Sequence, residues 1–290
     1  MPFRFKKSET PEKAVRRVGG ERVEAALDWL EKAQRPAAIH NVRKEIKKLR
    51  ALLRLVRGEI GDDYRRSMKP LRCAAGELAA SRDARVIFRA LENLAEDSDA
   101  RFPQLHKMLQ KNWRRETRQL FEGDLLPEVR RLLRKTGRRL RSLILKTPGW
   151  RAVAPGVRLG YARGKETFNL AVRKPSPENF HAWRKQVKTF WYQLQLISPK
   201  RSSEAQHFLD RLERLGEQLG VEHDLVLLKQ FIAGRRGAEA DEIVEVEKLI
   251  DTRRTQLRQA VIKSGGQLFA REPASTCQRL EKCWRDWRGE

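Results

Sequence analysis

The sequence predicts an all-α protein made of two four-helix bundles, related by a pseudo-two-fold axis and produced by an internal duplication. Three observations indicate this fold. Lys, Arg, Glu, Leu and Ala dominate the composition, which favours helix, and the alternation typical of strands is hard to find. Apolar residues recur at helical spacing between Pro- and Gly-containing breakers. A block of residues in the first half returns in the second half.

The repeated block has one constant register. Four residues have identical counterparts 141 positions later (181 − 40): His40, Arg43, Lys44 and Lys47 correspond to His181, Arg184, Lys185 and Lys188. The same offset pairs Asp83 with Asp224, so the His-to-Asp spacing is 43 residues in both halves (83 − 40 and 224 − 181). We therefore expect two copies of one unit, residues 1–147 and 148–290, joined at Pro148-Gly149.

Each unit is expected to hold about four main helices, separated by Gly and Pro. In the first unit the expected helices span residues 10–33, 37–59, 62–80 and 83–98, followed by a longer basic segment over 101–145. In the second unit they span 152–173, 177–197, 201–219, 223–234 and 238–264. The tail 275–290 predicts an extra helix. Gly19-Gly20 is expected to interrupt the first helix, and Gly265-Gly266 to end the last one of the second unit.

The net charge of the chain is extreme. Lys and Arg number 63 against 38 Asp and Glu, which gives +25 at pH 7. So much like charge on a compact body destabilises it by self-repulsion, and a bound polyanion would relieve that repulsion. The alternative is a basic surface that is simply solvated.

The helix expected at 37–59 separates apolar and basic residues on opposite faces. Its apolar stripe consists of Val42, Ile46, Leu49, Leu53 and Val56. The opposite wedge consists of His40, Arg43, Lys44, Lys47 and Arg54, with Arg50 at its edge. No acidic residue shares that wedge, because Glu45 points aside. Stacked like charges cost the helix a few tenths of a kcal/mol per pair, about 0.2–0.5 kcal/mol.

The second copy has the same design. Its apolar stripe is Trp183, Val187, Phe190, Leu194 and Ile197, and its wedge is His181, Arg184, Lys185, Lys188 and Tyr192. The repulsion between like-charged side chains occurs at matching positions in both units, which indicates anion binding on these two faces. The alternative is that both faces are simply solvated.

The histidines and aspartates of the repeat have two interpretations each. His40 and His181 either donate to a phosphate oxygen or satisfy a carbonyl near the start of their helices. Neither has a second His or a Glu four residues later, so this helix predicts no metal pair. Asp83 and Asp224 are expected to cap the fourth helix of each unit, with some pairing to a basic side chain of the second helix.

More basic residues lie outside the repeated helices. Arg114, Arg115 and Arg118 follow Trp113, and Arg253, Arg254 and Arg258 occupy a similar place in the second unit. A third run between residues 130 and 141 either extends a binding surface or is a solvated linker helix.

These residues resemble the CHAD family, the conserved-histidine α-helical domain, over roughly residues 10–265. The motif H-x-x-R-[KR]-x-x-K-x-x-R stands as His40, Arg43, Lys44, Lys47 and Arg50, with Lys48 inside it, and in part as His181, Arg184, Lys185 and Lys188. An Asp after a Leu-Gly-type turn follows at Leu219-Gly220 and Asp224. The resemblance implies two bundles facing across a basic channel that binds inorganic polyphosphate without catalysis.

This sequence departs from the family pattern in both units. Thr189 and Trp191 replace Lys48 and Arg50 in the second unit, and Ala79 to Arg82 stand where a Leu-Gly turn would be typical. We therefore expect asymmetric binding.

Other functional classes have less support in the sequence. There is no GxxxxGK[ST] loop, no HExxH motif and no paired carboxylates for two-metal chemistry, so neither catalysis nor a cofactor or metal is expected. Non-sequence-specific RNA or DNA binding is the serious alternative, although the basic wedges offer few aromatic residues for base stacking. A scaffold that tethers proteins to polyphosphate granules would add to the binding.

The same residues predict a location. Three cysteines without CxxC spacing suggest reduced thiols, residues 1–17 lack the apolar region of a signal peptide, and no stretch of 18 apolar residues exists. We therefore expect a cytoplasmic protein without a membrane partner.

Overall fold

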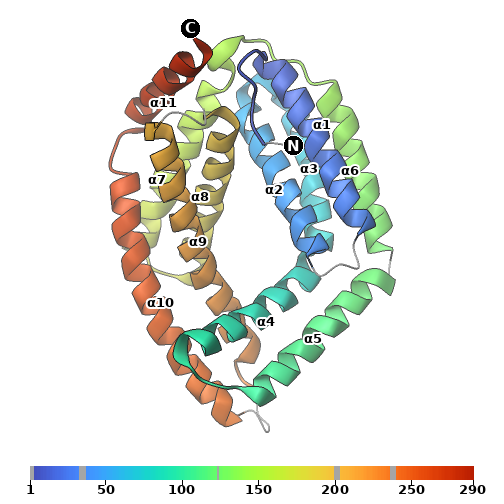
Figure 1. Ribbon diagram of the computed structural model, residues 1–290, viewed down its shortest axis with the longest axis vertical. Helices are drawn as coiled ribbons and strands as arrows, with labels where there is room; N and C mark the ends of the chain where they lie inside the picture. The colour runs from blue at the N-terminus through green and yellow to red at the C-terminus, as the bar shows by residue number, and fades with distance from the viewer. Residues whose placement is uncertain (1–2, 33–36, 123, 199–202, 236–239) are drawn as a thin grey trace.

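The computed structural model describes residues 3–32, 37–122, 124–198, 203–235 and 240–290, and its regular structure in these ranges is entirely helical (Figure 1). The helices are α1 (Pro11–Glu31), α2 (Ala38–Leu55), α3 (Arg57–Glu77), α4 (Ala79–Ser98), α5 (Pro103–Glu122), α6 (Leu125–Arg141), α7 (Ala154–Arg173), α8 (Pro177–Ile197), α9 (Ser203–Ile232), α10 (Ala240–Leu268) and α11 (Pro273–Arg288). A short 3₁₀ helix, Gly149–Ala152, precedes α7. The prediction of an all-α protein is confirmed.

The helices are arranged as an oval ring (Figure 1). Helices α1, α2, α3 and α6 pack on one another as a four-helix bundle on one side. Helices α7, α8, α9 and α10 form the other side, with α11 against α7. Helices α4 and α5 close the ring at the bottom, where they pack on the lower parts of α9 and α10. The fourth helix of the first bundle is thus α6, whereas α4 leaves that bundle because its apolar face is covered by α5 and α9.

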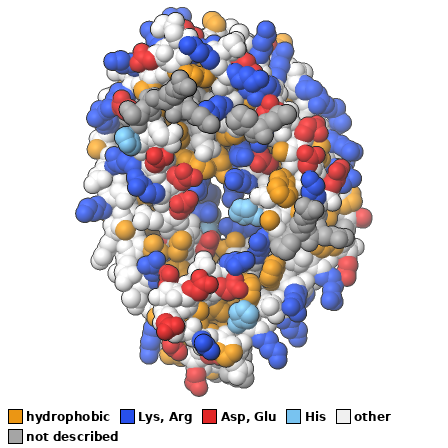
Figure 2. All heavy atoms as spheres, in the orientation of Figure 1, with side chains coloured by type: hydrophobic (Ala, Val, Ile, Leu, Met, Phe, Trp, Pro, Cys, Tyr) orange, Lys and Arg blue, Asp and Glu red, His pale blue; other side chains and the backbone are white. Residues whose placement is uncertain are grey.

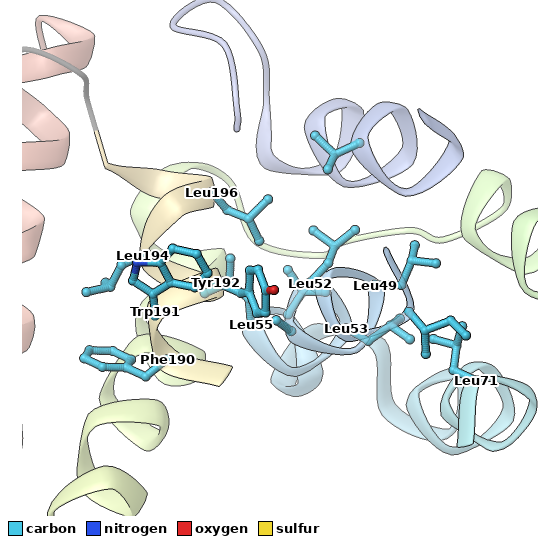
Figure 3. Close-up of a cluster of buried hydrophobic side chains, with 14 of the residues drawn as sticks. Leu49, Leu52, Leu53, Leu55, Leu71, Phe190, Trp191, Tyr192, Leu194 and Leu196 are labelled. Carbon is cyan, nitrogen blue, oxygen red and sulfur yellow. The ribbon is translucent and has the colours of Figure 1, made fainter. Parts of the chain in front are cut away.

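Two hydrophobic cores hold this arrangement together. The larger core joins the two sides where α2 packs on α8, and Figure 3 shows Leu52 and Leu55 of α2 beside Tyr192 of α8. The smaller core lies at the bottom and includes Leu91 of α4 and Leu228 of α9. Both apolar stripes expected from the sequence are buried, so the apolar faces of α2 and α8 are as predicted.

Helix α7 also lies very close to α2. A Cβ atom on Gly156 would stand 1.9 Å from the carbonyl oxygen of Leu55, so only glycine permits this approach of the two backbones. This backbone contact fixes how α2, which carries the first copy of the repeated basic motif, is oriented toward the second side of the ring.

Two glycine pairs do not break helices, contrary to the prediction. Gly19 lies inside α1, where a Cβ would stand 3.0 Å from Leu140 Cδ1 of α6. Gly265 lies inside α10, where a Cβ would stand 2.6 Å from the ring of Trp183. In both places the close packing of a neighbouring helix outweighs the poor helix propensity of glycine, which is about 1 kcal/mol.

Two expectations about α4 and α9 were also wrong. Among the described residues, the expected helices 201–219 and 223–234 are parts of one helix, α9 (Ser203–Ile232), so Leu219-Gly220 is not a turn. The basic segment expected over 101–145 contains two helices, α5 and α6. Asp83 and Asp224 lie inside α4 and α9 and therefore cap neither helix. A break was expected at Gly58 with Gly61, and Gly61 does interrupt the helix: it has φ +45° and bends α3. Two prolines that were also expected to separate helices, Pro36 and Pro199, lie outside the described residues.

Candidate functional site

Basic side chains from three helices meet at the centre of the ring. We define the central basic cluster as His40, Arg43 and Lys47 of α2, Arg82 of α4, and Arg184 and Lys188 of α8. Their mutual proximity is evident at Lys47, whose pKa is lowered first by burial and then by the charges of Arg184, Arg82, Arg43 and Lys188. Figure 2 shows a hollow at the centre of this face, with Lys, Arg and His side chains on its right and Asp and Glu side chains on its left.

The cations of this cluster have lost water without gaining enough anions. Burial, followed by the neighbouring guanidinium of Arg184, lowers the pKa of Lys47 to about 7. Burial likewise lowers the pKa of Arg43 and of Lys188. Each shift reflects a charge that is less stable here than in water.

Two glycines of α9 make room for the basic residues of α8. A Cβ on Gly216 would stand 2.8 Å from Cδ of Lys188, and one on Gly220 would stand 3.5 Å from Nε of Arg184. The Lys188 stem therefore packs on Gly216 more closely than a Cβ atom would allow, whereas the Arg184 side chain would be in ordinary contact with a Cβ at position 220. Gly220, which the sequence suggested as part of a turn, instead seats Arg184.

On the first side of the ring, Arg43 has a different seat. Its Nη1 donates to the carbonyl oxygen of Ala75, which lies in the last turn of α3. Carbonyls in the last turn of a helix lack intrahelical donors, so they readily accept such a bond. The Nε atoms of Arg43 and of Arg184 both lack a hydrogen-bond partner among the described residues.

Acidic residues also lie near the cluster: Asp83 and Asp224 beside Arg82, and Glu213 and Glu217 of α9 near Lys188. Arg82 donates to Asp83 at 2.6 Å and lies 3.7 Å from Asp224 of α9. Arg184 interacts with the same Asp224, whose pKa is nevertheless raised by burial. The expected pairing of Asp224 with a basic residue of the second helix is thus present electrostatically, while its expected capping role is absent.

A pair of stacked histidines stands beside these aspartates. The rings of His181 and His223 are 3.8 Å apart with 29° between their planes. Burial and the surrounding cations lower the pKa of His181 to about 4 and that of His223 to about 3, so both are neutral at pH 7. The pKa of His40 is also lowered, mainly by burial.

The basic face continues along α2 beyond the cluster. Arg50 and Arg54 follow Lys47 at helical spacing, and Arg54 donates to Thr189 of α8 at 3.3 Å. Burial and the charges of Arg54 and Arg72 lower the pKa of Arg50 to about 10. From His40 to Arg54 the row is about 20 Å long at a rise of about 1.5 Å per residue.

Several predicted site residues lie elsewhere. Lys48 binds Glu45 at 2.8 Å, and Glu45 is buried beside Arg22, so Lys48 is already neutralised. Tyr192 was expected on the basic wedge, but it is buried in the seam between α2 and α8 against Phe3, and burial raises its pKa to about 12. That prediction was wrong because the approach of α2 covers this end of α8. Lys44 and Lys185 are exposed at the edges of the two faces.

The basic residues predicted on α5 and α10 are also placed apart from the cluster. Arg114, Arg115 and Arg118 are exposed, and Arg115 binds its neighbour Glu116. Arg254 and Arg258 both bind Glu222 of α9, at 3.1 and 2.9 Å, and the Glu222 side chain is only 1% exposed. The α10 arginines therefore balance a buried carboxylate within the fold.

Replacing Glu222 with Leu should destabilise the protein without removing a cluster cation. The change leaves two partly buried guanidinium groups without their anion, which typically costs about 3–5 kcal/mol. Chemical denaturation would measure this loss of the free energy of unfolding. The double variant Arg254→Leu, Arg258→Leu leaves Glu222 unpaired and should be comparably destabilised. Full stability of the Glu222 variant would show that this ion-pair group contributes nothing.

The sequence interpretation missed Arg82 and His223. They occupy equivalent positions, since 223 − 82 equals the repeat offset of 141, and each directly precedes the aspartate of its unit. A basic residue before the repeated Asp in both units was the available signal.

Two features are absent from the part of the chain that the structure describes. No group of three His, Cys, Asp or Glu side chains there is arranged to hold a metal ion. No helix in the described ranges combines the length and apolar character needed to cross a bilayer.

The fold and the site define a class: a helical ring whose interior presents partly buried cations from both halves. The chain belongs to the CHAD domain family, which matches residues 18–233 and so includes both basic helices. Its fold is similar to that in the crystal structure of the CHAD domain from the plant Ricinus communis, with a TM-score of 0.60 and 18% identity over 100% of this chain and 96% of that one. A search of curated proteins found no match.

Proposed function

We propose that this protein binds inorganic polyphosphate at the central basic cluster and performs no catalysis on it. The observation that supports this most directly is the depressed pKa of Lys47, which reflects cations held together by the fold without sufficient counter-charge. A polyanion supplies that charge and releases its own condensed counterions on binding.

The burial of the cluster favours a thin ligand. Arg43, Lys47, Arg184 and Lys188 are all partly buried between helices rather than exposed on an outer face. An unbranched chain of phosphates has no bases or sugars, so it can thread among these side chains. The row that continues through Arg50 and Arg54 gives such a chain a path along α2.

Non-sequence-specific nucleic-acid binding is the second candidate, and a different surface favours it. Arg131, Arg134, Arg138 and Arg141 are exposed along one side of α6. An exposed row of arginines can contact the backbone of a duplex, which the interior of the ring does not admit as readily.

The deciding experiment is calorimetric titration with long-chain polyphosphate, RNA and duplex DNA at equal phosphate concentration and about 0.15 M salt, which weakens non-specific phosphate binding. Polyphosphate should bind far more tightly than either nucleic acid. Equal or tighter binding of RNA or DNA would overturn the proposal in favour of the second candidate.

Binding of this kind would place the protein in the cytoplasm at polyphosphate granules, where granule-associated proteins become its neighbours. A fluorescent fusion should then co-localise with granules and disperse when polyphosphate is enzymatically degraded in the cell. A fusion that stays on granules after Lys47 and Lys188 are replaced with Met would show that another surface does the targeting.

Gly216 gives a test of how α9 positions Lys188. The change Gly216→Ala should stabilise the helix by up to about 1 kcal/mol, because alanine is the better helix former. Its Cβ would displace Lys188, so polyphosphate affinity should fall while thermal stability is kept or raised. The matched control is Gly20→Ala in α1, where an added Cβ meets nothing within 4 Å. If both variants bind equally well, the seat on Gly216 is not required.

A further inference from the structure

A pocket of about 390 Å³ opens next to the central basic cluster, and the proposed function does not use it. It lies where the start of α2 meets α4, α5, α9 and α10. Its volume falls within the range of about 300–1,000 Å³ that is typical of small-molecule sites. His40, Arg82 and Asp224 line the pocket and also belong to the basic centre, so the two spaces are continuous.

The walls of the pocket are mainly apolar. Ile39, Val86, Leu94 and Leu225 contribute aliphatic surface, and the indole of Trp113 contributes an aromatic wall that is fixed by stacking on Phe88 at 5.4 Å. Val221 also lines the pocket and is 41% exposed, which is unusual for a large aliphatic residue on this chain. Apolar and aromatic side chains make no favourable contact with the charged oxygens of a bare phosphate chain.

Several polar groups of the pocket lining are engaged or enclosed. Arg82 lies 3.7 Å from Asp224, and Arg253 lies 3.3 Å from Asp97. Thr117 Oγ1 and Arg253 Nε make no hydrogen bond among the described residues, but protein atoms shield both of them from the pocket.

The junction of pocket and cluster is strongly positive. Helix α2 begins at the pocket, with Ala37 and His40 in its lining, and the amino end of a helix favours phosphate. Arg82 and Arg85 extend from α4 at the same place, and Arg85 lies 5.9 Å from the centre of the Trp113 ring.

We propose that the pocket binds the base of a nucleoside oligophosphate whose phosphates lie in the central basic cluster. This inference rests on the proposed function, because it assumes that the cluster binds a phosphate chain. The planar base lies between Trp113 and the aliphatic residues of α4 and α9. The protein then distinguishes nucleotide-capped phosphate chains from bare ones.

The test compares ATP with inorganic tripolyphosphate, which has the same number of phosphates and no base, both without divalent metal ions. ATP should bind about tenfold more tightly, given that stacking a base on an aromatic residue typically contributes about 1–3 kcal/mol. The variant Val221→Trp fills the mouth of the pocket from a partly exposed position and should abolish this advantage. Its matched control is Val244→Trp, at a similarly exposed position on α10 outside the pocket.

The outcomes separate the two proposals. Loss of the ATP advantage in Val221→Trp, with unchanged tripolyphosphate binding and an unchanged Val244→Trp control, supports the pocket. Equal affinity for ATP and tripolyphosphate in the unmodified protein, or equal weakening of both ligands by Val221→Trp, overturns the pocket inference alone. If tripolyphosphate, ATP and long-chain polyphosphate all fail to bind, the proposed function fails and this inference fails with it.

Discussion

Replacing both Lys47 and Lys188 with Met should weaken polyphosphate binding by at least about 100-fold, because each charge-assisted hydrogen bond typically contributes about 1.5–3 kcal/mol. The same variant should be more stable than the unmodified protein without ligand. Methionine keeps the apolar stem of lysine and removes a charge that burial and Arg184 disfavour at position 47. We expect a gain of about 2 kcal/mol in the free energy of unfolding. Calorimetric titration measures the first effect and denaturant melting the second.

The matched control removes two charges from the outer surface. Arg134 and Arg138 are exposed on α6, so Arg134→Met, Arg138→Met changes the net charge equally without touching the cluster. This control should keep most of the polyphosphate affinity. If the control loses as much affinity as the cluster variant, binding follows net charge rather than the central site. If the cluster variant is destabilised, its lysines are not in an unfavourable environment.

Affinity for polyphosphate should rise as the pH falls from 9 to 7, by about 20-fold, because the ligand returns a proton to Lys47. In the free protein the pKa of Lys47 lies near 7 instead of its ordinary 10.5. A bound polyanion raises this pKa again, so proton uptake accompanies binding throughout that window. His181, with a pKa near 4, adds a second window below its ordinary 6.5. Titration in buffers of different ionisation enthalpy counts the protons taken up.

The stability of the free protein should change in the opposite sense. Lys47 and His181 both have folded-state pKa values below their unfolded-state values, so the unfolded chain binds more protons and acidification favours unfolding. For Lys47 the loss accumulates as the pH falls from about 10.5 to about 7, and for His181 from 6.5 to about 4. The Lys47→Met variant should show neither the alkaline part of this loss nor the matching gain in affinity. A pH-independent affinity between 9 and 7 in the unmodified protein would contradict the assignment.

The sequence predicted the helical faces well and the helix ends less well. The stripes of α2 and α8 follow from spacing alone, because a residue such as Leu49 or Val187 must be buried wherever the helix goes. The continuity of α1 and α10 does not follow from spacing, since it depends on Leu140 and Trp183 packing on Gly19 and Gly265 from distant parts of the chain. The route of α4 away from its own bundle likewise depends on α9.

The candidate site was predictable in the same partial way. The repeated motif identified His40, Arg43, Lys47, Arg184 and Lys188, and the structure brings all of them together in the central basic cluster. It misplaced Tyr192, because the seam between α2 and α8 is a tertiary contact. It also overlooked that Lys48 and Arg254 have acidic partners, Glu45 and Glu222. Both carboxylates are buried by neighbouring helices, and a helical wheel drawn for one helix does not show such packing.

The crossing of α4 and α5 onto α9 and α10 has a consequence for synthesis on the ribosome. The apolar faces that begin at Ile87 emerge long before Leu225 and the rest of their covering surface have been made. At about 5–20 residues per second, translation keeps those faces waiting for roughly 7–30 s. The first half of the chain therefore depends on chaperones or on transient collapse until the second half arrives. A nascent chain stalled midway should be degraded or aggregate instead of surviving as a half-sized domain.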